Sequence, residues 1–194
     1  MKILVLFLSI VLLVSCSITP GSVISVTIIH ANEYNEQCFD NDSASLYDPN
    51  PEIRKLLLEN TICLSVVNHM AINDCDPEIR RLALLKTNSP STITHVALND
   101  REPELRKLAL KKTKSPSTIT QIAINDREPE IRRLALLKTE SPSTITHVAL
   151  NDREPELRKL ALKKTKSPST ITQIAINDRD IEIRELARQR LNNL

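Results

Sequence analysis

A unit of 26 residues repeats along most of this 194-residue chain. The stretch 101–126 reads REPELRKLALKKTKSPSTITQIAIND, and 153–178 repeats it without a change. Two close relatives of this unit occupy 75–100 and 127–152. The residues at the first motif position are Pro51, Pro77, Pro103, Pro129, Pro155 and, in a shortened last copy, Ile181. Repetition at a fixed period indicates supersecondary units that bury one another's apolar faces.

Each unit contains two segments with helical spacing. In 103–112, Leu105, Leu108 and Ala109 follow the i, i+3, i+4 pattern of an amphipathic helix. The proline at its start and the lysines at its end suit the two ends of a helix. After a Ser-Pro pair the same spacing recurs in 116–125. Because that segment carries threonines, which are poor helix formers, we expect a short helix with partial 3₁₀ character.

A strand is the alternative for the first segment. The pattern Leu105-x-x-Leu108-x-Leu110 also fits the start of an ordinary leucine-rich repeat, in which it would be a strand. However, Thr113 and Ser115 stand where that repeat has its asparagine and a further leucine. The preceding proline and the balanced charges favour a helix. The sequence therefore predicts an all-α fold, an α-solenoid of about five 26-residue two-helix repeats with a C-terminal capping helix.

A family resemblance rests on the same motifs. The string Asp-x-x-Pro-Glu-Leu-Arg-Lys-Leu-Ala, followed by Ser-Pro-Ser-Thr-Ile and Ile-Ala-Ile-Asn-Asp, resembles the leucine-rich repeat variant, and HEAT-like repeats share part of it. The resemblance covers 48–194 and implies a right-handed superhelix of alternating α and 3₁₀ helices. The first unit departs from it, because 51–74 lacks the Ser-Pro pair, and such a departure is typical of a terminal cap. The iron–sulphur cysteines of some variant repeats have no counterpart, so we expect no cluster.

The first residues have the features of a bacterial lipoprotein signal. Lys2 precedes an apolar run over 3–14, which is too short to span a bilayer. The run ends in Leu13-Val14-Ser15-Cys16, which resembles a lipobox. The resemblance implies cleavage after Ser15 and acylation of Cys16, so that a lipid anchors the chain to a membrane. Ser17, in place of an aspartate, implies the outer membrane if the source is Gram-negative.

These features divide the chain into three parts. We expect a signal peptide over 1–15, a lipid-anchored tether and N-terminal cap over 16–50, and the repeat array over 51–194. The predicted units of the array are 51–76, 77–102, 103–128, 129–154, 155–180 and the cap 181–194. An exported chain meets an oxidising compartment, which allows one disulfide among Cys38, Cys63 and Cys75 and leaves its pairing open.

Composition excludes several functions. The 26 basic and 24 acidic residues nearly balance, and aromatic residues are 2% of the chain, so we expect no nucleic-acid binding. His69, His95 and His147 share one repeat position with glutamines. Equivalent residues of neighbouring units lie about 10 Å apart, too far to share one metal ion. No nucleophile–base pair stands out, so the sequence predicts no enzyme, cofactor or metal site.

Basic residues recur at one position of the first segment, where they allow two interpretations. They are Arg80, Arg106, Arg132, Arg158 and Arg184. Stacked units would align them into a ladder that binds a polyanion, helped by Lys111, Lys112, Lys114, Lys163, Lys164 and Lys166. Alternatively they belong to a solvated face, neutralised by the equally regular Glu78, Glu104, Glu130 and Glu156. Glu102 and Arg106 are also spaced to pair on that face. We prefer the solvated face.

The leading functional hypothesis is a non-catalytic, membrane-anchored scaffold of the bacterial envelope that binds a protein partner. The partner, the oligomeric state and the side of the membrane that the array faces are left open. One alternative is a structural envelope lipoprotein without a specific partner. Another binds a polyanion or cell-wall polymer through the basic ladder.

Overall fold

The array consists of paired helices in the computed structural model, which describes residues 44–193. The first helices of the units are α2 (Pro51–Asn60), α4 (Pro77–Lys86), α6 (Pro103–Lys112), α8 (Pro129–Lys138), α10 (Pro155–Lys164) and α12 (Ile181–Leu191). The second helices are α3 (Leu64–Asn73), α5 (Pro90–Asn99), α7 (Pro116–Asn125), α9 (Pro142–Asn151) and α11 (Pro168–Asn177). Residues 44–46 form one further helical turn, and none of the described residues lies in a strand.

Local capping explains where these helices begin and end. The N–H of Thr113 donates to the Ala109 carbonyl at 2.8 Å and ends α6. The Thr113 hydroxyl then accepts the N–H of Ser115 at 3.2 Å, which closes the turn between the two helices. Ser115 caps α7 by accepting the Thr118 N–H at 3.3 Å, with Pro116 in the first turn. A capped start and a proline at the first position favour helix over the threonines' weak propensity.

The second helices differ from expectation in one respect. The sequence predicts partial 3₁₀ character, but α7 and its equivalents are α-helical over ten residues each. Packing accounts for the difference, because most helical stability in proteins comes from an apolar face buried against neighbours. In α7 that face includes Ile119, Ile122 and Ala123. The threonines also gain partners, since the hydroxyls of Thr120 and Thr144 lie 2.9 Å apart between α7 and α9.

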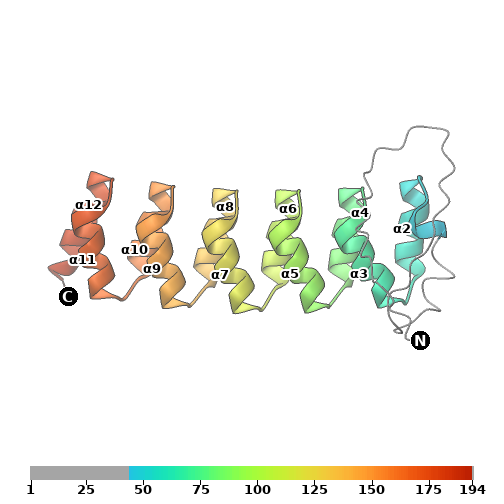
Figure 1. Cartoon of the computed structure of the whole chain (residues 1–194), viewed down its shortest axis with the longest axis horizontal. Helices are drawn as coiled ribbons and strands as arrows, with labels where there is room; N and C mark the ends of the chain where they lie inside the picture. Colours follow the sequence, from blue (N-terminus) through green and yellow to red (C-terminus); the bar gives the residue numbers. More distant parts are fainter. Residues whose placement is uncertain (1–43, 194) are drawn as a thin grey trace, which may run out of the picture. The chain divides into compact units, whose positions relative to one another are not determined.

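The units stack in a row, so that a continuous core runs between the two layers of helices. Each second helix from α3 to α11 packs against the first helix of the next unit, and neighbouring second helices pack side by side (Figure 1). The core is aliphatic, and alanines such as Ala97, Ala109 and Ala123 are fully buried at helix contacts. The predicted all-helical repeat solenoid is confirmed. The strand alternative is wrong, because Leu105–Leu110 lies within α6.

Candidate interaction surfaces

The recurring arginines of the first helices lie inside the array. Arg80, Arg106 and Arg132 are each 2% exposed and Arg158 is 1% exposed. Each guanidinium binds the aspartate 20 residues later, at the end of its own unit's second helix. In the central unit, Arg106 Nε donates to Asp126 Oδ2 at 2.9 Å and Nη2 donates to Asp126 Oδ1 at 3.0 Å. The same bidentate pair joins Arg54 to Asp74, Arg80 to Asp100, Arg132 to Asp152 and Arg158 to Asp178.

The third guanidinium nitrogen connects neighbouring units. Arg106 Nη1 donates to the carbonyl oxygen of Asp100, which ends the previous unit's second helix, at 3.0 Å. Asp126 also accepts the N–H of Glu128 at 2.8 Å, in the turn that leads to α8. One arginine therefore links two helices of its own unit with the end of the unit before it. Planar guanidinium geometry suits such bidentate and backbone contacts together.

The charges of these pairs support each other's ionised forms. The hydrogen bond with Asp126 raises the pKa of Arg106 above its ordinary value, although burial acts against this. At Asp178, burial opposes ionisation, but the hydrogen bonds from Arg158 and from the Asp180 N–H outweigh it. The pKa of Asp178 is therefore lowered. Both members of the Arg158–Asp178 pair stay charged at neutral pH.

Both interpretations of the arginine ladder therefore need correction. Arg80, Arg106, Arg132 and Arg158 form neither an exposed anion-binding stripe nor a solvated face, because their guanidiniums are buried and bound to aspartates. The expected Glu102–Arg106 pair gives way to the internal pair with Asp126. Arg184, in α12, is partly exposed and donates to the Asp178 carbonyl at 2.6 Å.

The lysine at the last position of each first helix from α4 to α10 binds backbone carbonyls of the neighbouring unit. Lys138 Nζ, at the end of α8, donates to the carbonyls of Leu110 at 2.7 Å and Thr113 at 2.7 Å, at the end of α6. Lys86, Lys112, Lys164 and Arg190 reach back to the preceding first helix in the same way. The last carbonyls of a helix have no partner within it and carry partial negative charge, so each cation caps its neighbour. Burial lowers the pKa of Lys112 and of Lys138.

The second helices form a surface without charged side chains. The exposed residues of α7 are Pro116, Ser117, Gln121 and Asn125. The helices α5, α9 and α11 carry the same types, with histidine for glutamine in α5 and α9, and α11 exposes Thr172 and Ile176 in addition. We call the aligned exposed sides of α5, α7, α9 and α11 the second-helix face. The first helices instead carry glutamates in the first turn and basic residues in the last turn.

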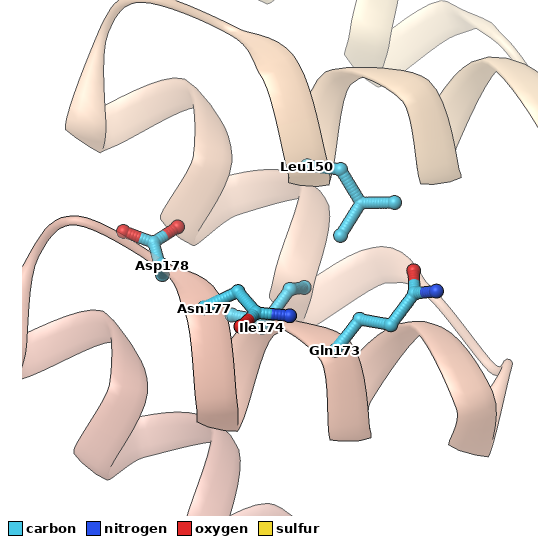
Figure 2. A pocket seen from close by; sticks show the side chains of 5 residues that line it. All are labelled: Leu150, Gln173, Ile174, Asn177 and Asp178. Atoms are coloured by element: carbon cyan, nitrogen blue, oxygen red, sulfur yellow. The ribbon is translucent and has the colours of Figure 1, made fainter.

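A small hollow lies on the second-helix face between α9 and α11. Its volume is about 190 Å³, and it is lined by Leu150, Gln173, Ile174, Asn177 and Asp178. Figure 2 shows the side chains of Leu150 and Gln173 on opposite sides of the space, with Asn177 and Asp178 further along α11. Near it, Ile176 is 67% exposed. Its lining joins the apolar side chains of Leu150 and Ile174 to the amides of Gln173 and Asn177 and to the Asp178 carboxylate, so the hollow is as polar as it is apolar.

The histidines do not come together around an ion. Nowhere in residues 44–193 do three or more His, Cys, Asp or Glu side chains form a group that could hold a metal. His95 and His147 are exposed on the second-helix face. His69 is partly buried and packs edge-on against Tyr47, with ring centroids 5.9 Å apart. Burial lowers the pKa of His69.

The residues of the predicted lipid anchor, Ser15 and Cys16, lie outside the described residues, as does Cys38. Cys63 and Cys75 are both disulfide-bonded. Within the described part of the chain, no helix combines the length and apolarity needed to cross a bilayer.

Comparisons of the chain with protein-family models, with curated proteins and with solved structures found no match.

Proposed function

We propose that this protein is a non-catalytic scaffold of the bacterial envelope, held at a membrane by a lipid on Cys16, that binds a protein partner along its second-helix face. The observation that carries the binding part is the absence of charge on that face. The cores of protein interfaces are depleted of lysine, glutamate and aspartate. The helices α5, α7, α9 and α11 contain none of these residues, nor arginine.

The internal pairing supports a scaffold role. Repeat arrays offer extended surfaces whose units each contact their neighbours. Here the most regular charged groups, the Arg–Asp pairs, join helices to helices. The hollow lined by Leu150 and Gln173 gives the second-helix face a recess with both polar and apolar groups.

The membrane anchor rests on the sequence and on one structural observation. The lipobox-like Leu13-Val14-Ser15-Cys16 predicts acylation. Disulfide-bonded Cys63 and Cys75 are typical of a protein exported to an oxidising compartment. The motifs Asp-x-x-Pro-Glu-Leu-Arg-Lys-Leu-Ala and Ser-Pro-Ser-Thr-Ile support membership of the leucine-rich repeat variant.

The anchor and the partner are tested separately. Wild-type protein is expected to incorporate labelled palmitate and to sediment with membranes, whereas Cys16→Ala does neither. Palmitate labelling and sedimentation of the alanine variant would contradict the anchor. Crosslinking in intact membranes, followed by isolation of the protein, is expected to return the same protein partner in repeated preparations. If no partner recurs, the structural-lipoprotein alternative is favoured instead.

A further inference from the structure

The two ends of the first helices carry opposite charge. The first turns contain Glu78, Glu104, Glu130 and Glu156. The last turns and the loops after them contain Lys86, Lys111, Lys112, Lys114, Lys138, Lys163, Lys164 and Lys166, with Glu59 and Glu140 as the acidic residues. We call this second set of lysines and its surroundings the lysine edge. The net charge of +2 therefore conceals a strongly basic edge.

The first helices lie with these ends adjacent. Lys112 at the end of α6 reaches the carbonyl of Leu84 at the end of α4, at 2.9 Å, and Lys138 repeats the contact from α8 to α6. The last turns of successive first helices are thus neighbours along one edge of the array. The edge is continuous over α4, α6, α8 and α10.

Some lysines of the edge make no contact that holds the array together. In the described chain, the Nζ groups of Lys111, Lys114, Lys163 and Lys166 form no hydrogen bond or ion pair, and all four side chains are exposed. The neighbouring Lys112 and Lys164 bind carbonyl oxygens. The four free lysines are therefore available for a ligand, unlike the arginines of the buried ladder.

Exposed leucines alternate with these lysines. Leu85 and Leu137 occupy the position that Lys111 and Lys163 hold in the next units, and they are 49% and 46% exposed. A soluble polyanion gains nothing from apolar side chains between the cations. A bilayer surface uses both, because lysines attract anionic headgroups while apolar side chains enter the headgroup boundary.

We propose that the lysine edge docks the array on a membrane surface rich in anionic phospholipid. The proposal rests on the proposed membrane anchor, because a lipid on Cys16 keeps the array close to a bilayer surface. The segment from Cys16 to Ala44 spans at most roughly 100 Å when extended, which is long enough for the edge to reach the bilayer. Docked on this edge, the array holds its helices upright and leaves the second-helix face open to a partner.

The test uses the full-length protein with Cys16→Ala, so that no acyl chain contributes to binding. This unacylated background carries either the four-lysine substitution (Lys111, Lys114, Lys163 and Lys166 to Gln) or a matched arginine substitution. The charge-matched variant changes Arg101, Arg127, Arg153 and Arg179 to Gln, at the opposite end of the first helices. Because each of these arginines donates to a backbone carbonyl of the preceding unit, its fold must be verified before its binding is compared. A ten-residue helix is about 15 Å long, which exceeds the Debye length of about 8 Å at physiological salt. The two variants lose the same charge, but only one loses it from the edge.

Cosedimentation is measured with vesicles of phosphatidylglycerol and phosphatidylcholine, and with phosphatidylcholine alone. We expect the background protein to bind anionic vesicles, the lysine variant to lose about tenfold or more in partitioning, and the arginine variant to keep most of it. Leu85→Gln with Leu137→Gln is expected to weaken binding several-fold. Circular dichroism verifies the helical content of each variant.

Three results would overturn the proposal. The first is that the lysine variant binds anionic vesicles as well as the background protein does. The second is that the arginine variant loses as much binding as the lysine variant. The third is that the background protein binds phosphatidylcholine vesicles as well as it binds anionic vesicles. Leucine substitutions without effect, together with capture by soluble polyphosphate that resists vesicle competition, would assign the edge to a soluble polyanion instead. Palmitate labelling of the wild type, measured separately, shows whether the anchor or the edge has failed.

Discussion

At the scale of single residues, the buried Arg–Asp pairs carry the largest energetic consequence. The side chains of Arg106 and Asp126 are 2% and 3% exposed, and four hydrogen bonds fix the guanidinium. Two buried charges that neutralise each other contribute little net stability compared with apolar residues of the same shape. Removing one partner is different, because the other charge then stays buried without compensation.

Asp126→Asn is therefore expected to lower the free energy of unfolding by about 3 kcal/mol, as measured by urea denaturation. The asparagine can still accept the Glu128 N–H, so the loss reports mainly on the uncompensated arginine. Glu104→Gln, an exposed substitution with the same change of charge, is the control and should change stability by less than about 0.5 kcal/mol. Equal, small losses in both variants would contradict the importance of the buried pair.

His69 gives a prediction about pH. Because burial lowers its folded-state pKa below the ordinary 6.5, the folded protein takes up a proton less readily than the unfolded chain. The stability contributed by neutral His69 is present above pH 6.5 and is lost as the pH falls from there toward the folded pKa. His69→Gln, which copies the residue at position 121, should lose less stability between about pH 7.5 and 5 in urea titrations. His95→Gln on the exposed face is the matched control, and an unchanged pH slope in His69→Gln would contradict the assignment.

At the scale of helices, the sequence predicts most of the architecture. The apolar spacing, the Ser-Pro pairs and the first-turn prolines locate both helices of a unit. What the sequence interpretation missed is the direction of the basic side chains. Within the chain, the fourth motif position is arginine in every unit, while the fifth changes between Arg81, Lys107 and Glu185. An arginine that is present in every unit and is followed 20 residues later by an aspartate indicates a buried bidentate pair. An exposed position, in contrast, can hold different residues in different units.

The capping cations show the same distinction. Position ten of the motif is basic from Lys86 to Arg190, and position nine alternates between leucine and lysine in the four central units. The basic residue at position ten is explained only by the stacking of units, because the carbonyls that it binds belong to the preceding first helix. A helical pattern within one unit cannot reveal a contact made between units.

Lys112→Met tests this cap. The substitution keeps the aliphatic stem and removes the hydrogen bonds to the carbonyls of Leu84 and Leu85. Because the site is partly exposed to water, we expect a loss of about 1 kcal/mol in the free energy of unfolding. Lys111→Met, one residue earlier, removes a lysine without partners and should leave stability unchanged. Equal effects of the two substitutions in urea denaturation would show that the carbonyl contacts contribute nothing.

At the scale of the whole molecule, the array is modular. Each unit contacts its neighbours through an apolar core, through an arginine Nη1 that donates to a carbonyl of the preceding unit, and through the capping lysines. Stability in such arrays is approximately a sum of unit terms and neighbour terms. The segments 75–126 and 127–178, each of two units, are nearly identical in sequence. Either segment can therefore pack against the same neighbouring units.

Deleting residues 127–178 is expected to leave a folded, shorter array. The junction joins Asp126 to Arg179, which reproduces the natural Asp178–Arg179 step and preserves the pairing register. Helical signal per residue should be retained, while the urea m-value falls because less surface is exposed on unfolding. A deletion variant without helical signal would contradict the modular description.

The position of the partner tests the central claim most directly. A photo-crosslinking residue is placed at Gln121, on the second-helix face, or at Glu104, on the charged first-helix side, and membranes are irradiated. The account predicts a recurring crosslinked protein from position 121 and a much weaker product from position 104. A recurring product from position 104 alone, or from neither position, would contradict the assignment of the second-helix face as the binding surface.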